Sequence, residues 1–169
     1  MPDPTIAIAP ARRDQLPEVQ RLAGVIWRAH YPGIITPEQI EYMLDLGYSF
    51  DVLESFLGRP DRGLELATVE GALAGFAAWY VTDNPAETKV DKLYVLQSRQ
   101  RHGLGGRLLA RVVDAARAAG AAMLILNVNK QNTMAIRAYE KHGFTIREAV
   151  VVDIGRGYVM DDYVMAKPL

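Results

Sequence analysis

The sequence contains no cysteine and only three histidines among its 169 residues. Without thiols the chain can form neither a disulfide nor a thiolate zinc site, and it has no cysteine nucleophile. The histidines, at positions 30, 102 and 142, are too isolated from one another to suggest a metal site. A chain without cysteine fits a reducing compartment, so we expect a cytoplasmic protein that uses no metal.

Charge imbalance and long apolar runs are also absent. Nineteen basic and 20 acidic residues leave a formal net charge of −1, which gives no overall field toward nucleic acid or a membrane surface. The longest apolar stretches fall far short of the roughly 20 residues that a membrane span needs. The first ten residues lack the basic and apolar regions of a signal peptide. We expect one domain over residues 1–169 with a core of its own.

Hydrophobic periodicity predicts an alternation of helices and strands. Helices are expected over 16–31, over 36–46 with Thr36 as N-cap and Gly47 just past the end, over 51–58 with Asp51 as cap, over 104–119, and over 132–143 with Asn132 as N-cap. Strands are expected over 5–10, over 64–85 as a hairpin turning near Glu70 and Gly71, over 88–96, over 122–128, and over 144–169 as a second hairpin. Helices first, then a mixed sheet with two helices packed on it, indicate an α/β or α+β fold.

The stretch "RQRHGLGGRLL", residues 99–109, lies between a predicted strand and the longest predicted helix. Gly103, Gly105 and Gly106 allow the backbone to approach a ligand closely. The unsatisfied amides of the first helical turn and the helix dipole favour an anion there. Basic side chains could add to the attraction of a phosphate: Arg99, Arg101, His102 and Arg107. The alternative is a plain tight turn with a solvated basic face.

Two familiar phosphate-binding motifs do not fit this stretch. The nucleotide P-loop requires Gly-Lys-Ser/Thr, whereas the chain has Gly106, Arg107 and Leu108. The dinucleotide fingerprint requires a third glycine at position 108, which belongs to the apolar stripe of the helix. The sequence therefore does not favour a nucleotide-binding protein that takes ATP or NAD at this turn.

The spacing Gln100-x-x-Gly103-x-Gly105 resembles the Q/R-x-x-G-x-G/A signature of the GNAT superfamily of acyl-CoA N-acyltransferases. A second block, "LNVNKQNTMAIRAYEKHGF" over residues 126–144, resembles the strand and asparagine-capped helix that follow in that family. The order of elements agrees along essentially the whole chain. The resemblance implies a GNAT fold, with a mixed central sheet whose strands splay apart and are flanked by helices, and acetyl-CoA as co-substrate.

The resemblance also implies where coenzyme A binds. The amides of residues 101–106 would hold the pyrophosphate, and the pantetheine arm would enter between the strand carrying Val95 and the strand ending at Asn127. The implied cofactor-binding residues are Leu93, Tyr94, Val95, Gln100, Arg101, His102, Gly103, Leu104, Gly105, Gly106, Asn132 and Ala135. For Asn132 the plain alternative is a helix N-cap, and both roles can coexist. The side chain of His102 could equally be a solvated loop residue.

Tyr139 stands where the family often keeps a tyrosine beside the thioester sulfur. A phenol could give a proton to the leaving thiolate, although the spacing alone also suits a core aromatic. With no cysteine and no G-x-S-x-G motif, direct attack by an amine is simpler than a covalent intermediate. Candidates for the base, unranked, are Asp91, Glu87 and His30, and an amide near Val95 could bind the oxyanion.

The acceptor site in such proteins is built by the first two helices and the later loops. The candidates here are Trp27, His30, Tyr31, Tyr158, Asp161 and Asp162. Aromatic walls and carboxylates would suit a cationic amine, whereas the alternative makes Trp27 and Tyr31 core residues and the Asp pair a solvated turn. The stretches "WRAHYPGIITPEQIEYML" and "MDDYVM" are also similar to polyamine-acetyltransferase-like members of the superfamily.

The resulting hypothesis is an N-acetyltransferase that moves an acetyl group from acetyl-CoA to a primary amine directly, in a ternary complex. The acceptor would be a small amine, a polyamine or a peptide amine. The alternative is a non-catalytic acyl-CoA-binding sensor or regulatory protein on the same fold. Because family members often pair through C-terminal strands, the apolar end "YVMAKPL" makes a homodimer plausible.

Overall fold

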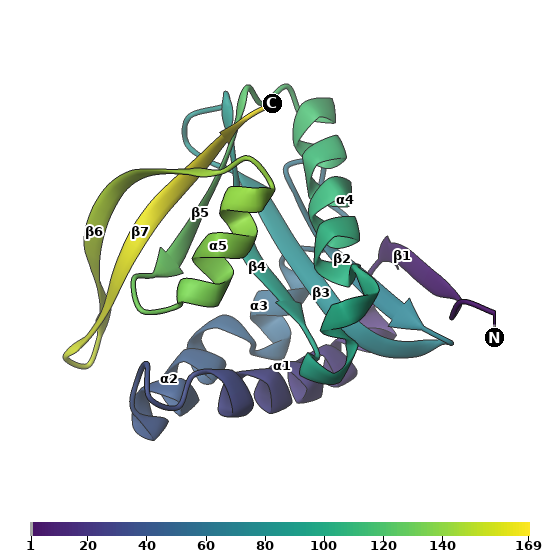
Figure 1. Ribbon diagram of the computed structural model, residues 1–169, viewed down its shortest axis with the longest axis horizontal. Helices are drawn as coiled ribbons and strands as arrows, with labels where there is room; N and C mark the ends of the chain where they lie inside the picture. Colours follow the sequence, from purple (N-terminus) through teal and green to yellow (C-terminus); the bar gives the residue numbers. More distant parts are fainter. Residues whose placement is uncertain (1) are drawn as a thin grey trace.

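Seven strands form one mixed sheet in the order β1-β2-β3-β4-β5-β7-β6 in the computed structural model, which describes residues 2–169 (Figure 1). The strands are β1 (Ile6–Pro10), β2 (Arg62–Val69), β3 (Ala72–Val81), β4 (Glu87–Val95), β5 (Met123–Asn129), β6 (Thr145–Gly155) and β7 (Tyr158–Pro168). The α-helices are α1 (Leu16–His30), α2 (Pro37–Gly47), α3 (Phe50–Glu54), α4 (Leu104–Ala118) and α5 (Thr133–Lys141), with short 3-10 helices η1 (Arg13–Gln15) and η2 (Gln97–His102). This mixed α/β arrangement confirms the predicted fold class.

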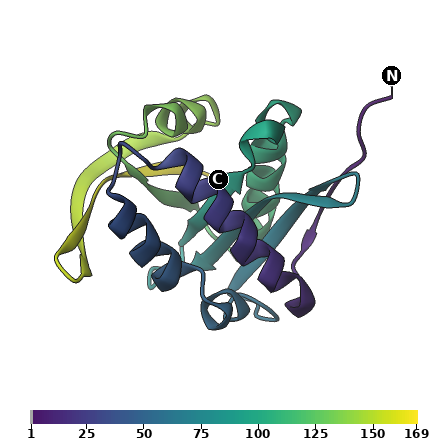
Figure 2. The ribbon, with the colours of Figure 1, turned by 90° about the horizontal axis from the view of Figure 1, so that it is seen from below.

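The helices cover the two faces of the sheet in separate groups. Helices α1 and α2 lie across one face, and α4 and α5 lie on the other (Figure 2). Because side chains alternate along a strand, β3 contributes to both cores. Phe76 and Ala78 pack with α1, α2 and α3, while Ala77 and Trp79 pack with α4. No helix within residues 2–169 is both long enough and apolar enough to span a membrane.

The predicted helices form because their apolar positions repeat at helical spacing. In α1 the side chains predicted to face the core are all buried: Leu16, Val19, Leu22, Ala23 and Ile26. The same is true of the predicted stripe of α4: Leu104, Leu108, Leu109, Val112, Val113 and Ala116. The central strand β5 is buried on both faces at Leu124, Ile125 and Leu126, as its uninterrupted apolar run predicts.

Helix ends follow the sequence with two exceptions. The side chain of Thr36 accepts a hydrogen bond from the Gln39 amide at 3.2 Å, as predicted. The prediction that Asp51 caps α3 is wrong, because Ser49 is the N-cap and its hydroxyl accepts from the Val52 amide at 3.3 Å. Asp51 instead lies in the first turn, where its carboxylate suits the helix dipole. Gly47 is the last residue of α2 rather than the residue after it.

Both predicted hairpins are present. Glu70 and Gly71 have φ values of 50° and 79°, which fits a two-residue turn with both central residues left-handed. The β6–β7 hairpin turns in the same way, with φ values of 54° and 79° at Arg156 and Gly157. Strand β7 lies between β5 and β6, so most of the apolar C-terminal stretch packs inside the chain.

The sheet opens where β4 passes β5. Opposite β3, Ala78 pairs with Lys92 and Trp79 pairs with Val90, which leaves Asp91 as the extra residue of a β-bulge. In the described residues, β4 pairs with β5 only over Glu87–Val90 and Met123–Leu126. Residues 91–95 and 127–129 therefore separate, and the predicted splay of these two strands is confirmed.

Candidate active site

The opening between β4 and β5 exposes one edge of the β4 backbone. Leu93, Tyr94 and Val95 pair with Ala77, Phe76 and Gly75 of β3, which satisfies only one edge of the strand. In the described residues the other edge has no β5 partner at these positions. A free strand edge presents alternating N–H and C=O groups, so it can pair with an extended ligand that carries amides.

The N-terminus of α4 lies next to the end of β4, and its amides are free to bind an anion. The N-cap Gly103 has φ 70° and ψ 20°, and it has no side chain to cap the helix. The first turn contains no acidic residue. A Cβ on Gly105 would meet its nearest atom, Cγ2 of Val95, at 3.9 Å, an ordinary contact that leaves the turn uncrowded. These features suit a phosphate group.

Gln100, Arg101 and His102 belong to the 3-10 helix η2, which turns the chain from β4 into α4. The side chain of Arg101 lies outside the described part of the structure. His142, at the end of α5, approaches the first turn of α4 closely, because a Cβ on Gly106 would lie 3.3 Å from its Cε1 atom. The N-terminal turn of α4 and the C-terminal end of α5 are therefore neighbours.

Asn132 and Tyr139 stand at the two ends of α5. The Asn132 side chain is buried and accepts from the Ala135 amide at 3.4 Å, so it is a helix N-cap, as predicted. Tyr139 packs edge-on against Phe144 with ring centroids 5.6 Å apart. Burial raises the pKa of Tyr139 well above its usual value, and the neighbouring Tyr31 raises it further. The phenol therefore stays protonated and able to donate throughout the neutral range.

A cluster of aromatic side chains lies on the α1 side of the opening. The hydroxyl oxygens of Tyr31 and Tyr94 are 2.9 Å apart, and Nε1 of Trp27 donates to the Tyr48 hydroxyl at 3.0 Å. Burial raises the pKa of Tyr31 to about 12, although its bond with Tyr94 lowers it, and the charge of Asp162 raises it further. Trp27 and Tyr31 are only 4% and 6% exposed, so the structure places both in the core.

Tyr31 links the two faces of the sheet. Tyr139 packs against the apolar core on the α4 and α5 side of the sheet, and Tyr31 belongs to the apolar core on the α1 and α2 side. Tyr31 nevertheless raises the pKa of Tyr139. The charge of Asp162, on β7, also raises the pKa of Tyr31. Tyr31 also contacts the Tyr94 hydroxyl, so the end of α1 reaches the half of β4 that has separated from β5.

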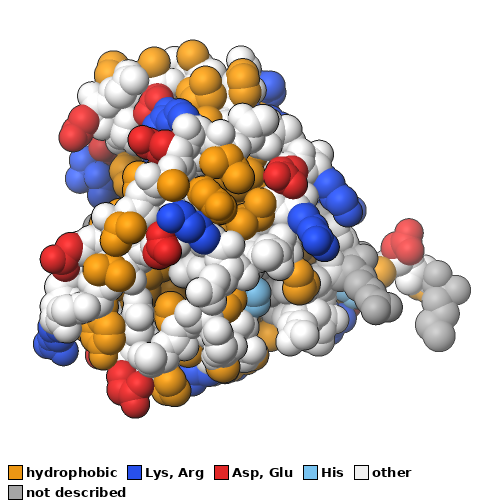
Figure 3. Space-filling view, turned by 60° about the vertical axis from the view of Figure 1, so that its left-hand side comes forward, with side chains coloured by type: hydrophobic (Ala, Val, Ile, Leu, Met, Phe, Trp, Pro, Cys, Tyr) orange, Lys and Arg blue, Asp and Glu red, His pale blue; other side chains and the backbone are white. Residues whose placement is uncertain are grey.

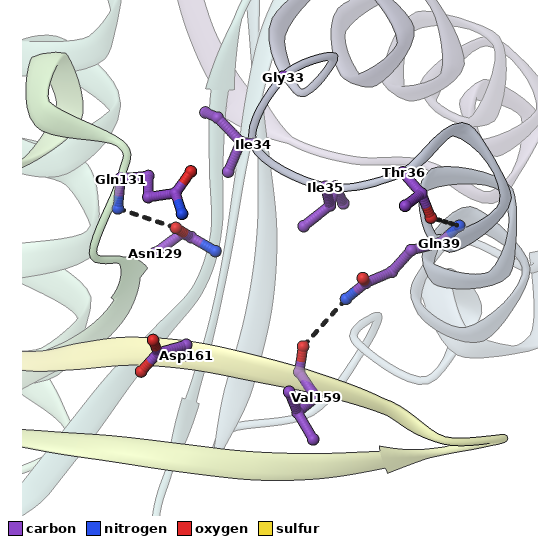
Figure 4. A pocket seen from close by; sticks show the side chains of 9 residues that line it. All are labelled: Gly33, Ile34, Ile35, Thr36, Gln39, Asn129, Gln131, Val159 and Asp161. Carbon is purple, nitrogen blue, oxygen red and sulfur yellow. Dashed lines mark hydrogen bonds between the residues drawn. The ribbon is translucent and has the colours of Figure 1, made fainter.

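A pocket of about 440 Å³ lies between the α1–α2 connection, the β5–α5 turn and β7 (Figure 4). Its lining residues are Gly33, Ile34, Ile35, Thr36, Gln39, Asn129, Gln131, Val159 and Asp161. Nε2 of Gln39 donates to the Val159 carbonyl at 3.0 Å and ties α2 to β7. Asp161 is the charged member of this lining, and it forms an ion pair with Lys130 at 2.6 Å.

The other predicted acceptor residues are not in the pocket lining. Tyr158 stacks on Tyr42 with ring centroids 5.2 Å apart, near the β6–β7 turn. His30 is half-buried and stands edge-on to Tyr31 at 4.9 Å. The structure thus brings Asp161 to the pocket and leaves Tyr158 and His30 beside it.

Of the possible bases Asp91, Glu87 and His30, the two carboxylates each form an ion pair with a neighbouring cation. Glu87 begins β4, in the paired half of the strand, and binds Arg147 at 2.7 Å. Asp91 stands in the bulge and binds the buried ammonium of Lys92 at 2.7 Å. The alternative of a solvated turn at Asp161 and Asp162 is wrong for Asp162, which lies within β7 and is only 4% exposed. Across residues 2–169, no three His, Asp or Glu side chains gather to form a metal-binding group.

Comparison with known proteins agrees with this geometry. The uncharacterized N-acetyltransferase Mb2688 of Mycobacterium bovis is 29% identical over 138 residues, covering 82% of this chain and 87% of that protein. The PaiA N-acetyltransferase of Thermoplasma acidophilum, solved in complex with coenzyme A, superposes with a TM-score of 0.83 at 23% identity, covering 98% and 99% of the two chains. The ribosomal-protein-S18-alanine N-acetyltransferase of Escherichia coli gives a TM-score of 0.70 at 25% identity, covering 97% and 94%.

Residues 25–144 match the family model described as the acetyltransferase (GNAT) family. The matched range runs from within α1 to Phe144, three residues past the end of α5, and includes the open strand edge, the glycine turn and Tyr139. The chain belongs to the GNAT family of acetyltransferases.

Proposed function

We propose that this protein transfers the acetyl group of acetyl-CoA to a primary amine, directly and within a ternary complex. The observation that carries the proposal is the free edge of β4 leading to the uncapped N-terminus of α4. The strand edge offers amide pairing, and the helix N-terminus offers an anion site. The two follow one another in the same order as the pantetheine arm and the pyrophosphate of coenzyme A. The shared fold with a protein solved in complex with coenzyme A supports this assignment.

The residues near the opening have distinct roles in this proposal. Main-chain groups of Leu93, Tyr94 and Val95 pair with the pantetheine amides, and the amides of residues 101–106 hold the pyrophosphate. Gln100, Asn132 and Ala135 border the arm. The absence of a crowding contact at Gly105, whose Cβ would be 3.9 Å from its neighbour, leaves room for the phosphates.

Tyr139 is the proposed acid. Sulfur gains charge as the amine nitrogen bonds to the carbonyl carbon, and the Tyr139 hydroxyl gives its proton to the thiolate. Burial keeps the phenol protonated until a stronger base appears beside it. A β4 amide close to Val95 stabilises the negative charge on the carbonyl oxygen.

The acceptor amine enters through the pocket between α2 and β7. Asp161, Asn129 and Gln131 present oxygen atoms along one side of this pocket, which suits a cationic amine. Amine acceptors of a small-molecule, polyamine or peptide kind all fit this description.

The deciding experiment measures thiol release from acetyl-CoA with pools of polyamines, peptides, amino acids and aminoglycosides, and identifies products by mass spectrometry. We expect one pool to yield an acetylated product and Tyr139→Phe to slow its formation without changing the affinity for coenzyme A. Coenzyme A binding with no product in any pool would instead support an acyl-CoA-binding sensor.

We also propose that the protein forms a homodimer through the edge strand β6 rather than through the apolar C-terminus. Val151 and Val152 of β6 are 66% and 40% exposed, and Figure 3, which turns the β6–β7 side forward, shows hydrophobic side chains gathered among charged ones. Exposed apolar residues on an edge strand favour pairing with another chain. Light scattering of the wild type and of Val151→Lys tests this proposal.

A further inference from the structure

Asp162 is a buried carboxylate with an unused oxygen. It lies in β7, paired with Asn129 of β5 and Val150 of β6, and is 4% exposed. In the described part of the chain its Oδ1 atom has no hydrogen-bond donor. An unpaired buried carboxylate oxygen is unfavourable, so its retention calls for an explanation in a ligand or a reaction.

The place of Asp162 in the fold points to the reaction. Its cross-strand partner Asn129 lies in the half of β5 that has left β4, and Asn129 also lines the acceptor pocket. Its chain neighbour Asp161 lines the same pocket. The charge of Asp162 raises the pKa of Tyr31, and Tyr31 in turn raises the pKa of Tyr139. Asp162 is therefore the immediate neighbour of two residues that line the pocket, and it is paired with the half of β5 that has separated from β4.

We propose that Asp162 is the base that receives the proton of the acceptor ammonium before attack. The inference rests on the proposed acetyl transfer and adds the residue that prepares its nucleophile. The other carboxylates near the site already have cationic partners: Asp161 binds Lys130, Asp91 binds Lys92 and Glu87 binds Arg147. Asp162 is distinguished from them by its free, buried oxygen.

The proton balance closes with the groups present. Asp162 takes one proton from the ammonium, directly or through water, and later releases it to solvent. The neutral nitrogen then bonds to the carbonyl carbon and the carbon–sulfur bond breaks. The second nitrogen proton restores the one that Tyr139 gives to the thiolate, so the products are an amide, a free thiol and one proton.

The environment of Asp162 suits this role. Removal from water raises its pKa above the usual range for a carboxyl, which brings it closer to that of an amine. The Asn127 side-chain amide, Lys89 on β4 and Lys130 after β5 oppose this increase, whereas Asp161 adds to it. Activity should therefore be lost as the pH falls through the raised pKa of Asp162.

The test compares Asp162→Asn, which keeps the shape of the side chain, with the control Asp114→Asn, the same change at an exposed aspartate of α4. Acetylation of putrescine and glycinamide at saturating acetyl-CoA is followed from pH 6 to pH 10, together with coenzyme A binding. We expect Asp162→Asn to lower kcat/KM about 10²-fold or more at pH 7. The loss should shrink toward pH 10, where a larger fraction of the amine is already neutral, while coenzyme A affinity stays unchanged. Asp114→Asn should stay within about threefold of the wild type at all pH values.

An equal loss at every pH, or a loss of coenzyme A affinity, would assign Asp162 a structural role and overturn the inference. A second measurement needs no turnover: calorimetry of putrescine and glycinamide binding to the enzyme–coenzyme A complex. Asp162→Asn should weaken this binding about tenfold. Equal binding, or no binding to the wild type, overturns the assignment of Asp162. If the wild type acetylates the amine and Asp162→Asn does so equally well, the proposed acetyltransferase function is kept and the role of Asp162 as base is rejected.

Discussion

The hydroxyl oxygens of Tyr31 and Tyr94 lie 2.9 Å apart, one at the end of α1 and the other on the strand that opens the sheet. This bond joins the helical layer to the part of β4 that has no β5 partner in the described residues. Tyr94 also packs its ring on Trp27, at 5.6 Å between centroids. The open half of β4 is therefore held in place from the α1 side, which keeps its free edge available.

The buried tyrosines predict a loss of stability at high pH. Burial raises the pKa of Tyr31 from 10.0 to about 12, so the folded state holds this proton more tightly than the unfolded chain does. The resulting stabilisation is complete below pH 10 and is lost as the pH rises through 12, an effect of about 2–3 kcal/mol. Urea unfolding at pH 9, 10, 11 and 12 measures it. Tyr31→Phe should cost about 1 kcal/mol at pH 7 and flatten this alkaline decline.

Tyr158→Phe is the matched control for that series, because Tyr158 stacks on Tyr42 outside the buried cluster. An alkaline decline that is equally steep in Tyr31→Phe and in the wild type would show that Tyr31 does not cause it.

The glycine turn makes a separate prediction for coenzyme A. At Gly105 a side chain meets no close neighbour in the free protein, so Gly105→Glu should fold and be no less stable. Its carboxylate would occupy the first turn of α4 and repel the pyrophosphate, and binding of coenzyme A should be lost. Gly105→Ala adds the Cβ without the charge and should bind within about tenfold of the wild type. Calorimetry with coenzyme A and thermal unfolding of both variants measure the two effects, and normal binding by a folded Gly105→Glu would place the pyrophosphate elsewhere.

Much of the fold is local enough to be predicted from the sequence. The apolar stripe of α4 and the caps Thr36 and Asn132 depend on residues three or four positions apart, and all are found as predicted. The cap of α3 was misassigned because Ser49 and Asp51 are both good cap residues. Only the backbone conformation at Ser49, extended with ψ 156°, decides between them.

The site depends on contacts that are distant in the sequence. The bulge at Asp91 arises from pairing with β3, and the meeting of Tyr31 with Tyr94 joins residues 63 positions apart. The sequence left Asp162 open between an acceptor residue and a solvated turn, because its burial comes from β5 and β6 on either side. Successive side chains of a strand point to opposite faces of the sheet. In the strand expected here, this alternation was the one local sign that Asp161 and Asp162 face different surroundings.

Tyr139→Phe should remove the acid and leave the fold and the cofactor site intact. The variant keeps the ring that packs on Phe144, so unfolding should change little. We expect kcat to fall by about 10²–10⁴ with an unchanged affinity for coenzyme A. Because the pKa of Tyr139 is raised well above 10.0, the wild-type rate should show no decline from Tyr139 ionisation below pH 10. Pre-steady-state thiol release measures the chemical step, and a variant with wild-type kcat would exclude this tyrosine as the acid.

The pocket predicts which amines are preferred. Asp161 is the charged residue among those that line it, and Asp162 adds a second carboxylate close by. An acceptor with a free carboxylate next to its amine would bring a like charge toward both, which is unfavourable in a partly buried site. Glycinamide and glycine have similar shapes but differ in this charge, so kcat/KM expressed per neutral amine should be at least tenfold higher for glycinamide. Asp161→Asn should narrow the ratio by lowering the negative charge of the lining. Equal kcat/KM values per neutral amine for both acceptors would mean that the amine reaches the thioester by another route.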